Sequence, residues 1–208
     1  MFNRRRFIQR GMTASLAVFP FVKGFSALPV SAKKPVVIST WGHGIPANEA
    51  AWKVLQPGGS ALDAVEAGVR VPEGDPQVMS VGFGGRPDRD GHVTLDACIM
   101  DNKGNAGSVC CLEYIKHPVS VARLVMEKTP HVMLSGEGAL EFALQNGFKK
   151  EDLLTDNAKR QWENWKKEAS YQPEVNIENH DTISMLALDQ DGNLSGACTT
   201  SGLAYKMH

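Results

Sequence analysis

The sequence has few of the features that would indicate a metalloprotein or a disulfide-stapled fold. Its only cysteines, which show neither paired metal-ligand spacing nor disulfide-scaffold density, are Cys98, Cys110, Cys111 and Cys198. Because successive residues of a strand point to opposite faces, we expect Cys110 and Cys111 to be separated, with at least one serving as ordinary core packing. The sequence therefore predicts no metal site and no cofactor.

The chain also lacks an excess of charge and a long apolar run. Its formal net charge of −1 gives no broad electrostatic reason to expect nucleic acid or a membrane surface as a partner. The apolar stretch at residues 11–22 is roughly half a dozen residues too short to span a bilayer. A hydrophobic content of 42% and a charged content of 22% are ordinary for a globular protein. The length suits one domain, or one domain and part of another.

Residues 1–32 are expected to be a leader outside the fold. The segment Asn3-Arg4-Arg5-Arg6-Phe7-Ile8-Gln9 resembles a twin-arginine export motif, and Val30-Ser31-Ala32 offers small residues for cleavage after Ala32. Twin-arginine export carries folded proteins, so the leader predicts a periplasmic or secreted protein with no membrane association after export. An ordinary Sec signal and an uncleaved lipid-adjacent anchor are the alternatives.

Strand and helix patterns alternate through the rest of the chain and predict a layered α/β arrangement. Strands are predicted at residues 35–40, 93–100, 106–112, 182–189 and 193–200, the last four forming two hairpins. Helices are predicted at residues 48–55, 60–71, 119–128, 136–145 and 158–169. On the last helix, Trp162 and Trp165 have a spacing more typical of core contact than of a ligand platform.

The most informative stretch is His180-Asp181-Thr182-Ile183-Ser184, where a threonine follows an acid at the start of an apolar segment. A threonine hydroxyl is a poor nucleophile without an adjacent base, and no Ser-His-Asp set lies nearby. Cleavage of the Asp181–Thr182 bond would give Thr182 an α-amino group with a pKa of roughly 7.7–8.0, suited to accept the hydroxyl proton. The chain is therefore interpreted as a precursor that makes its own active site. A solvent loop with a capping acid is the alternative.

This stretch resembles the cleavage site of the glycosylasparaginases (aspartylglucosaminidases), a family of N-terminal nucleophile hydrolases. Three further blocks resemble the same family in the same order, so that the resemblance covers about residues 35–208. They are residues 80–97 (SVGFGGRPDRDGHVTLDA), residues 130–134 (PHVML) and residues 192–202 (GNLSGACTTSG). A lone Asp-Thr pair would carry no weight, whereas four ordered blocks are highly specific.

The resemblance implies an α+β fold, a four-layer αββα sandwich whose nucleophile strand is central in one sheet and whose second sheet is incomplete in this chain. It divides the chain into an α-subunit-like half (residues 33–181) and the start of a β-subunit-like half (residues 182–208). It also implies that these halves pair as a heterodimer and assemble into a dimer. The implied reaction is hydrolysis of the amide bond between N-acetylglucosamine and an asparagine side chain.

The resemblance also assigns roles to individual residues. Thr182 matches the nucleophile, and Thr200 the threonine that hydrogen-bonds it. Trp41 matches a tryptophan beside the substrate, with a core aromatic as the alternative, and Ser80 matches a serine near the nucleophile's amino group. For the self-cleavage step, Asp181 is expected to help remove the hydroxyl proton while His180 orients or tunes it.

Three departures from the family pattern affect the expectation of activity. The family carries glycine where this chain has Ser184, and a serine side chain restricts close backbone approach and positive φ. An aromatic residue stands in the family where this chain has His43. Family residues that grip the substrate's α-carboxylate and α-amino group, and a Thr-Gly pair that supplies the oxyanion hole, would lie beyond His208.

The last departure predicts an incomplete enzyme: a fragment, a truncated product or half of a split protein. The hairpin formed by residues 182–208 is expected to expose unpaired strand edges and an uncovered apolar face. Two alternatives to a glycosylasparaginase remain. One is an isoaspartyl peptidase/L-asparaginase, which shares the threonine nucleophile. The other is a catalytically inactive secreted protein that acts as an interaction module.

Overall fold

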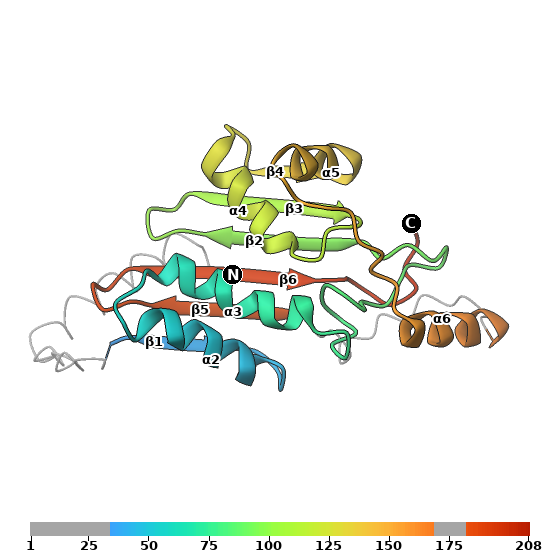
Figure 1. Cartoon of the computed structure of the whole chain (residues 1–208), viewed down its shortest axis with the longest axis horizontal. Coiled ribbons are helices and arrows are strands. Elements are labelled where there is room, and N and C mark those ends of the chain that lie inside the picture. The colour runs from blue at the N-terminus through green and yellow to red at the C-terminus, as the bar shows by residue number, and fades with distance from the viewer. Residues whose placement is uncertain (1–33, 169–181) are drawn as a thin grey trace, which may run out of the picture. The chain divides into compact units, whose positions relative to one another are not determined.

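A computed structural model describes residues 34–168 and 182–208 (Figure 1). Within them, six strands form one sheet in the order β1-β5-β6-β2-β3-β4. Their bounds are β1 (Val36–Ser39), β2 (Leu95–Met100), β3 (Ala106–Leu112), β4 (Met133–Ser135), β5 (Ile183–Leu188) and β6 (Leu194–Thr200). All neighbouring strands are antiparallel except β3 and β4, which are parallel. The strand that follows Thr182 is therefore an interior strand.

Three helices cover one face of this sheet: α2 (Gly44–Leu55), α3 (Ala61–Gly74) and α4 (Pro118–Lys128) (Figure 1). Helix α3 packs across β5 and β6, and α4 packs across β2 and β3. Helix α5 (Gly136–Gln145) contacts β3 and β4, and α6 (Asp156–Glu168) follows it in the chain. Mixed α and β structure is confirmed by this arrangement.

The core lies between these helices and the sheet, and the alternation of strand residues decides which side chains enter it. In β5, Ile183, Met185 and Ala187 are buried, whereas Ser184 and Leu186 are exposed on the opposite face. Strands β2 and β6 alternate in the same way. Each large apolar side chain fully buried in this way contributes roughly 1.5–3 kcal/mol relative to an exposed one. The helix-covered face therefore supplies most of the stabilisation.

Both predicted hairpins are present, and the β5–β6 register runs from Ile183↔Thr199 to Leu188↔Leu194. The expectation of unpaired hairpin edges is wrong. Strand β1 pairs with β5 and β2 pairs with β6, so both edges are closed by segments far upstream in the chain. The uncovered apolar face is real, because Leu186 is 47% exposed and Leu194 is 54% exposed.

Local signals explain some of the element boundaries. Ser60 begins α3 by accepting a hydrogen bond from the Asp63 amide at 3.1 Å, and Gly147, at a φ of 89°, follows the end of α5. Helix α2 begins four residues before the predicted start, and α3 continues three residues beyond the predicted end. The short strand β4 was not predicted. Among the described residues, no helix has both the length and the apolar character needed to cross a membrane.

Candidate active site

Thr182 lies half-buried directly before β5, and Thr40 fixes the backbone around it. The Thr40 hydroxyl donates to the Thr182 carbonyl at 3.0 Å and accepts from the Ser184 amide at 3.0 Å. The Thr40 amide donates to the Ser184 carbonyl at 3.1 Å. Three hydrogen bonds from one residue therefore hold the start of β5 in place.

Thr200 ends β6 on the same face as Thr182. Extending the Ile183↔Thr199 pair by one residue sets Thr182 opposite Thr200, where antiparallel strands bring Cβ atoms to about 4.5–5.5 Å. The Thr200 hydroxyl donates to the Ser80 carbonyl at 3.4 Å and accepts from the Gly202 amide at 3.0 Å. Ser80 is thus held beside Thr200 through its main chain.

Trp41 follows Thr40 directly and is 52% exposed, so the alternative of a core aromatic is wrong. Its φ of 64° lies in the left-handed region, which is strained for a bulky residue. The Trp41 carbonyl accepts the Gly44 amide at 3.1 Å in the turn that leads into α2. An exposed, strained aromatic beside the residue that clamps Thr182 suits a substrate contact better than a packing role.

Most of the block SVGFGGRPDRDGHVTLDA forms a loop that leads into β2 and holds the segment after β6. The Ser201 amide donates to the Ser80 carbonyl at 2.7 Å, and the Tyr205 amide donates to the Pro87 carbonyl at 2.8 Å. A Cβ atom on Gly85 would lie 2.6 Å from the Cβ of Ser201, so only glycine permits this approach. The loop therefore orders the residues immediately after Thr200.

Two charged side chains, buried Asp88 and half-buried Lys206, strengthen the same contact. Burial alone would raise the pKa of Asp88. The Asp88 carboxylate accepts hydrogen bonds from the amides of His92 and Asp90 and is hydrogen-bonded to the His208 ring, and these bonds outweigh burial, so that its pKa is lowered. Burial lowers the pKa of Lys206, whose Nζ donates to the Ser201 carbonyl at 2.7 Å. The loop and the final segment are thus joined by charged as well as backbone contacts.

Ser184 does not require the conformation that the family glycine suggested. It lies within the β5 ladder and is not among the described residues with positive φ. Its hydroxyl donates to the Cys198 sulfur at 3.4 Å. Hydrogen bonding from Cys98, its cross-strand partner, and from Ser184 lowers the pKa of Cys198 to about 6.

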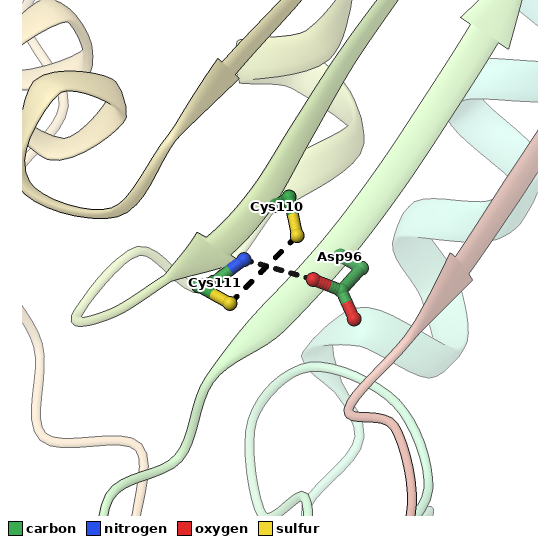
Figure 2. A group of neighbouring side chains, drawn as sticks. All are labelled: Asp96, Cys110 and Cys111. Atoms are coloured by element: carbon green, nitrogen blue, oxygen red, sulfur yellow. Dashed lines mark hydrogen bonds between the residues drawn. The ribbon is translucent and has the colours of Figure 1, made fainter. Parts of the chain in front are cut away.

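The expectation that Cys110 and Cys111 point to opposite faces is wrong. The β2–β3 register shifts between Leu95 and Ala97, and Cys111 has a φ of 52°. This bulge interrupts the alternation, so the two sulfurs lie 3.7 Å apart, beside the Asp96 carboxylate (Figure 2). The Cys111 amide donates to that carboxylate at 2.8 Å. Burial, Asp96 and Cys111 raise the pKa of Cys110 to about 12.

The structure brings some of the expected site residues together, whereas others do not belong to the part of the chain that it describes. Thr182 and Thr200 lie at one end of the sheet, where Trp41 is next to the residue that clamps Thr182 and Ser80 is bonded to Thr200. His180 and Asp181 lie outside the described residues. Thr40 was missed, although it lies in the Ser-Thr-Trp-Gly segment quoted for Trp41. The Asp96 cluster gave no sequence signal, because a bulge created it.

A cleft of about 600 Å³ lies away from these residues. It is lined in part by His92, Glu113, Lys150 and Trp162, and it includes none of the predicted catalytic positions. The Trp162 indole donates to the Arg89 carbonyl at 3.0 Å, and Trp165 stacks on Tyr205 at 4.6 Å. Both tryptophans are only half-buried, so they dock α6 against loop segments and are not part of the main core.

Comparison with known proteins gives a consistent group of relatives. Residues 44–208 match a family described as asparaginase. An N(4)-(β-N-acetylglucosaminyl)-L-asparaginase of Elizabethkingia miricola is 63% identical over 99% of this chain and 62% of its own length. One from Rattus norvegicus is 36% identical over 91% of this chain and 64% of its own length. An isoaspartyl peptidase/L-asparaginase of R. norvegicus is 42% identical over 75% of this chain and 48% of its own length. The chain therefore spans between about half and two thirds of these relatives.

Proposed function

The chain belongs to the asparaginase family, and from this premise we propose that it is an autoprocessing amidohydrolase with Thr182 as its nucleophile. The proposed substrate is asparagine that carries N-acetylglucosamine on its side-chain nitrogen, and the bond cleaved is that amide. The Elizabethkingia relative supports this choice, because it has this activity in its name and its similarity covers nearly the whole chain.

The single observation that carries the proposal is the position of Thr182 at the head of an interior strand. Its carbonyl is clamped by Thr40, and the β5–β6 register sets Thr200 opposite it. A nucleophile needs to be held within a narrow range of geometry, and a strand paired on both edges provides such rigidity. Neighbouring Trp41 offers an exposed aromatic surface for the substrate.

In the first reaction, the Thr182 hydroxyl attacks the carbonyl carbon of Asp181. The peptide nitrogen leaves as the α-amino group of Thr182, giving an ester that water hydrolyses to the Asp181 carboxylate and the free hydroxyl. The shift from amide to ester is uphill for a relaxed peptide and needs strain or an ionised neighbour. We assign removal of the hydroxyl proton to the side-chain carboxylate of Asp181. We assign to His180 the orientation of that carboxylate.

In the second reaction, the new α-amino group accepts the Thr182 hydroxyl proton while the oxygen attacks the substrate's side-chain amide carbon. The proton passes to the leaving glycosylamine, and water then hydrolyses the aspartyl ester. Thr200, whose hydroxyl is fixed by Ser80 and Gly202, is assigned a hydrogen bond to the nucleophile. Ser80 is assigned to the neighbourhood of the amino group.

The proposal extends to the architecture of the mature protein. Among the described residues, the face of the sheet opposite α2, α3 and α4 exposes a set of apolar side chains from four strands: Val36, Ile38, Met100, Leu186 and Leu194. Such a contiguous apolar face favours burial against another layer. We assign this face to the contact with the second sheet of a four-layer αββα sandwich, a sheet that is incomplete in this chain. Cleavage would divide the protein into residues 33–181 and a chain that begins at Thr182. In this proposal the two chains stay paired, the pairs form a dimer, and residues 1–32 direct export to the periplasm or the cell exterior.

N-terminal sequencing after denaturing electrophoresis tests the proposal. The folded protein should yield a fragment that begins at Thr182, together with the complementary upstream fragment. An intact band under every folding condition would instead favour the inactive interaction module. A fragment that begins at any other residue would overturn the assignment of the nucleophile.

A second candidate is isoaspartyl peptidase/L-asparaginase activity. The rat protein of that name is 42% identical over 75% of this chain, a higher identity over a shorter match than the rat glycosylasparaginase. Aspartate release distinguishes the two candidates. Release from glucosaminyl-asparagine but not from a β-aspartyl dipeptide supports the first candidate, and the reverse pattern supports the second.

A further inference from the structure

Three potential metal ligands converge at one end of the sheet, outside the residues assigned to catalysis. One carboxylate oxygen of Asp96 and the sulfurs of Cys110 and Cys111 all lie within 4.8 Å of one another. All three side chains are at least partly exposed, and both thiols are free (Figure 2). The bulge in β3 produces this convergence, because a regular strand would send the two thiols to opposite faces.

The spacing of the sulfurs matches a tetrahedral metal site. Two Zn–S bonds of about 2.3 Å that meet at the tetrahedral angle place their sulfurs about 3.8 Å apart. In this chain the separation is 3.7 Å, so both thiolates could bind one ion without moving apart. The Asp96 oxygen lies within 4.8 Å of both sulfurs and is the candidate third ligand.

The surrounding charge suits a divalent ion. Binding releases the two thiol protons, so that the ligands become two thiolates and one carboxylate. Lys206 interacts electrostatically with all three ligands, and its Nζ is held by the Ser201 carbonyl at 2.7 Å. The two thiolates and the carboxylate together carry three negative charges. These balance the two positive charges of the divalent ion and the one positive charge of the Lys206 ammonium.

We propose that Asp96, Cys110 and Cys111 form a binding site for a zinc-like divalent ion, with its fourth position open to solvent. Asp96 is the cross-strand partner of Thr200, so the site lies on the same face and at the same end of the sheet as the proposed nucleophile. Three protein ligands and one open position are typical of zinc sites that exchange water or a small ligand. None of its three ligands is among the residues assigned to the proposed reaction, although Asp96 is paired with Thr200.

Titration of the reduced full chain with Zn²⁺, followed by calorimetry, tests the site directly. One equivalent should bind, and Co²⁺ in its place should give the intense visible absorption of a tetrahedral thiolate complex. Cys110→Ser and Cys111→Ser should each weaken Zn²⁺ binding by at least about 100-fold. Loss of an outer-shell partner already costs up to about 100-fold in metal affinity, and a direct ligand should cost at least as much. Asp96→Asn should weaken Zn²⁺ binding less, by about 10-fold. Unchanged affinity in either serine variant would overturn the proposal.

Cys98→Ser is the matched control, because Cys98 is a free thiol on the same face with a cross-strand cysteine partner of its own. This variant should bind Zn²⁺ as the unaltered chain does. Alkylation followed by peptide mass analysis gives a second readout that does not depend on the stability of a variant. Zn²⁺ should protect Cys110 and Cys111 in the unaltered chain but leave Cys98 reactive. Protection confined to Cys98 and Cys198 would overturn the assignment.

Discussion

The two faces of the six-stranded sheet differ sharply, although the same strands form both. The helix-covered face consists of small and apolar side chains that are almost completely buried, among them Ile183, Met185 and Ala187. The open face carries hydroxyls, thiols and a carboxylate together with exposed apolar side chains, among them Ser184 and Leu186. Because successive residues of a strand point to opposite faces, residues that stabilise the core alternate along each strand with residues that are available for chemistry.

This difference explains why Thr182 and Thr200 both lie on the open face. Their immediate neighbours, Ile183 and Thr199, are completely buried beneath the helices and anchor the strands. A reactive hydroxyl on the covered face would be inaccessible to substrate. The buried residues thus hold the backbone rigid while their neighbours remain accessible to a ligand.

The strongest test of the open face is Thr182→Ala. Removing the hydroxyl should abolish both self-cleavage and hydrolysis of glucosaminyl-asparagine, because both proposed reactions use that oxygen. Gel analysis of cleavage and an aspartate-release assay measure the two losses. Thr182→Ser, which keeps a hydroxyl, should retain some cleavage. Normal cleavage in the alanine variant would show that another residue attacks.

A matched pair of substitutions in β5 compares how much the two faces of the sheet contribute to the free energy of unfolding. Met185→Ala should lower the free energy of unfolding by about 2–5 kcal/mol, because it leaves a cavity beneath α3. Leu186→Ala in the isolated chain should cost less than about 1 kcal/mol, since this side chain is 47% exposed there and would be buried only once the proposed second sheet covers this face. Urea unfolding measures both. Equal losses would mean that the open face is covered in solution, for example by a second sheet.

Asp189 tests the covered face at the turn that follows β5. Its buried carboxylate accepts the Asn193 amide at 2.9 Å and the Ala61 amide at 3.3 Å. Burial raises its pKa, but these hydrogen bonds outweigh burial and leave the pKa lowered. Asp189→Ala should therefore cost about 1–3 kcal/mol at neutral pH.

The pH dependence of this loss follows from the sign of the shift. A lowered folded-state pKa stabilises the protein above the unfolded value of about 3.9, and that contribution disappears as pH falls through the folded-state pKa. The stability difference between Asp189→Ala and the unaltered chain should shrink in acid. A constant difference across the acid range would exclude ionisation of Asp189 as the source.

Ser184→Gly should have the smallest effect. Ser184 already lies in the β5 ladder, so glycine offers no new conformation that self-cleavage needs, and the cleavage rate should stay unchanged. The free energy of unfolding should fall by about 0.5–1 kcal/mol, because glycine loses more backbone entropy. Timed gel analysis and urea unfolding measure the two quantities. Faster cleavage would mean that the serine side chain obstructs the reaction.

Much of the local structure could be predicted from the sequence because its signals are local. The β5–β6 hairpin follows from apolar runs on either side of Asp191-Gly192, and α3 follows from its Ser60 cap. The exposed apolar face expected of this hairpin is also present, since Leu186 is 47% exposed and Leu194 is 54% exposed. The candidate nucleophile was found for the same reason, since an acid followed by threonine at a strand start is visible within a few residues.

Long-range pairing decided the rest. No local pattern indicates that Thr40 will clamp Thr182, because 142 residues separate them in the chain. Likewise, the convergence of Cys110 and Cys111 on Asp96 depends on a bulge between two strands. The sequence alone determined which residues alternate along strands, which cap helices and which form turns, since each of these features depends on the neighbouring backbone. The tertiary structure alone decided which strand edges meet and where alternation breaks, because those outcomes depend on the register between distant segments.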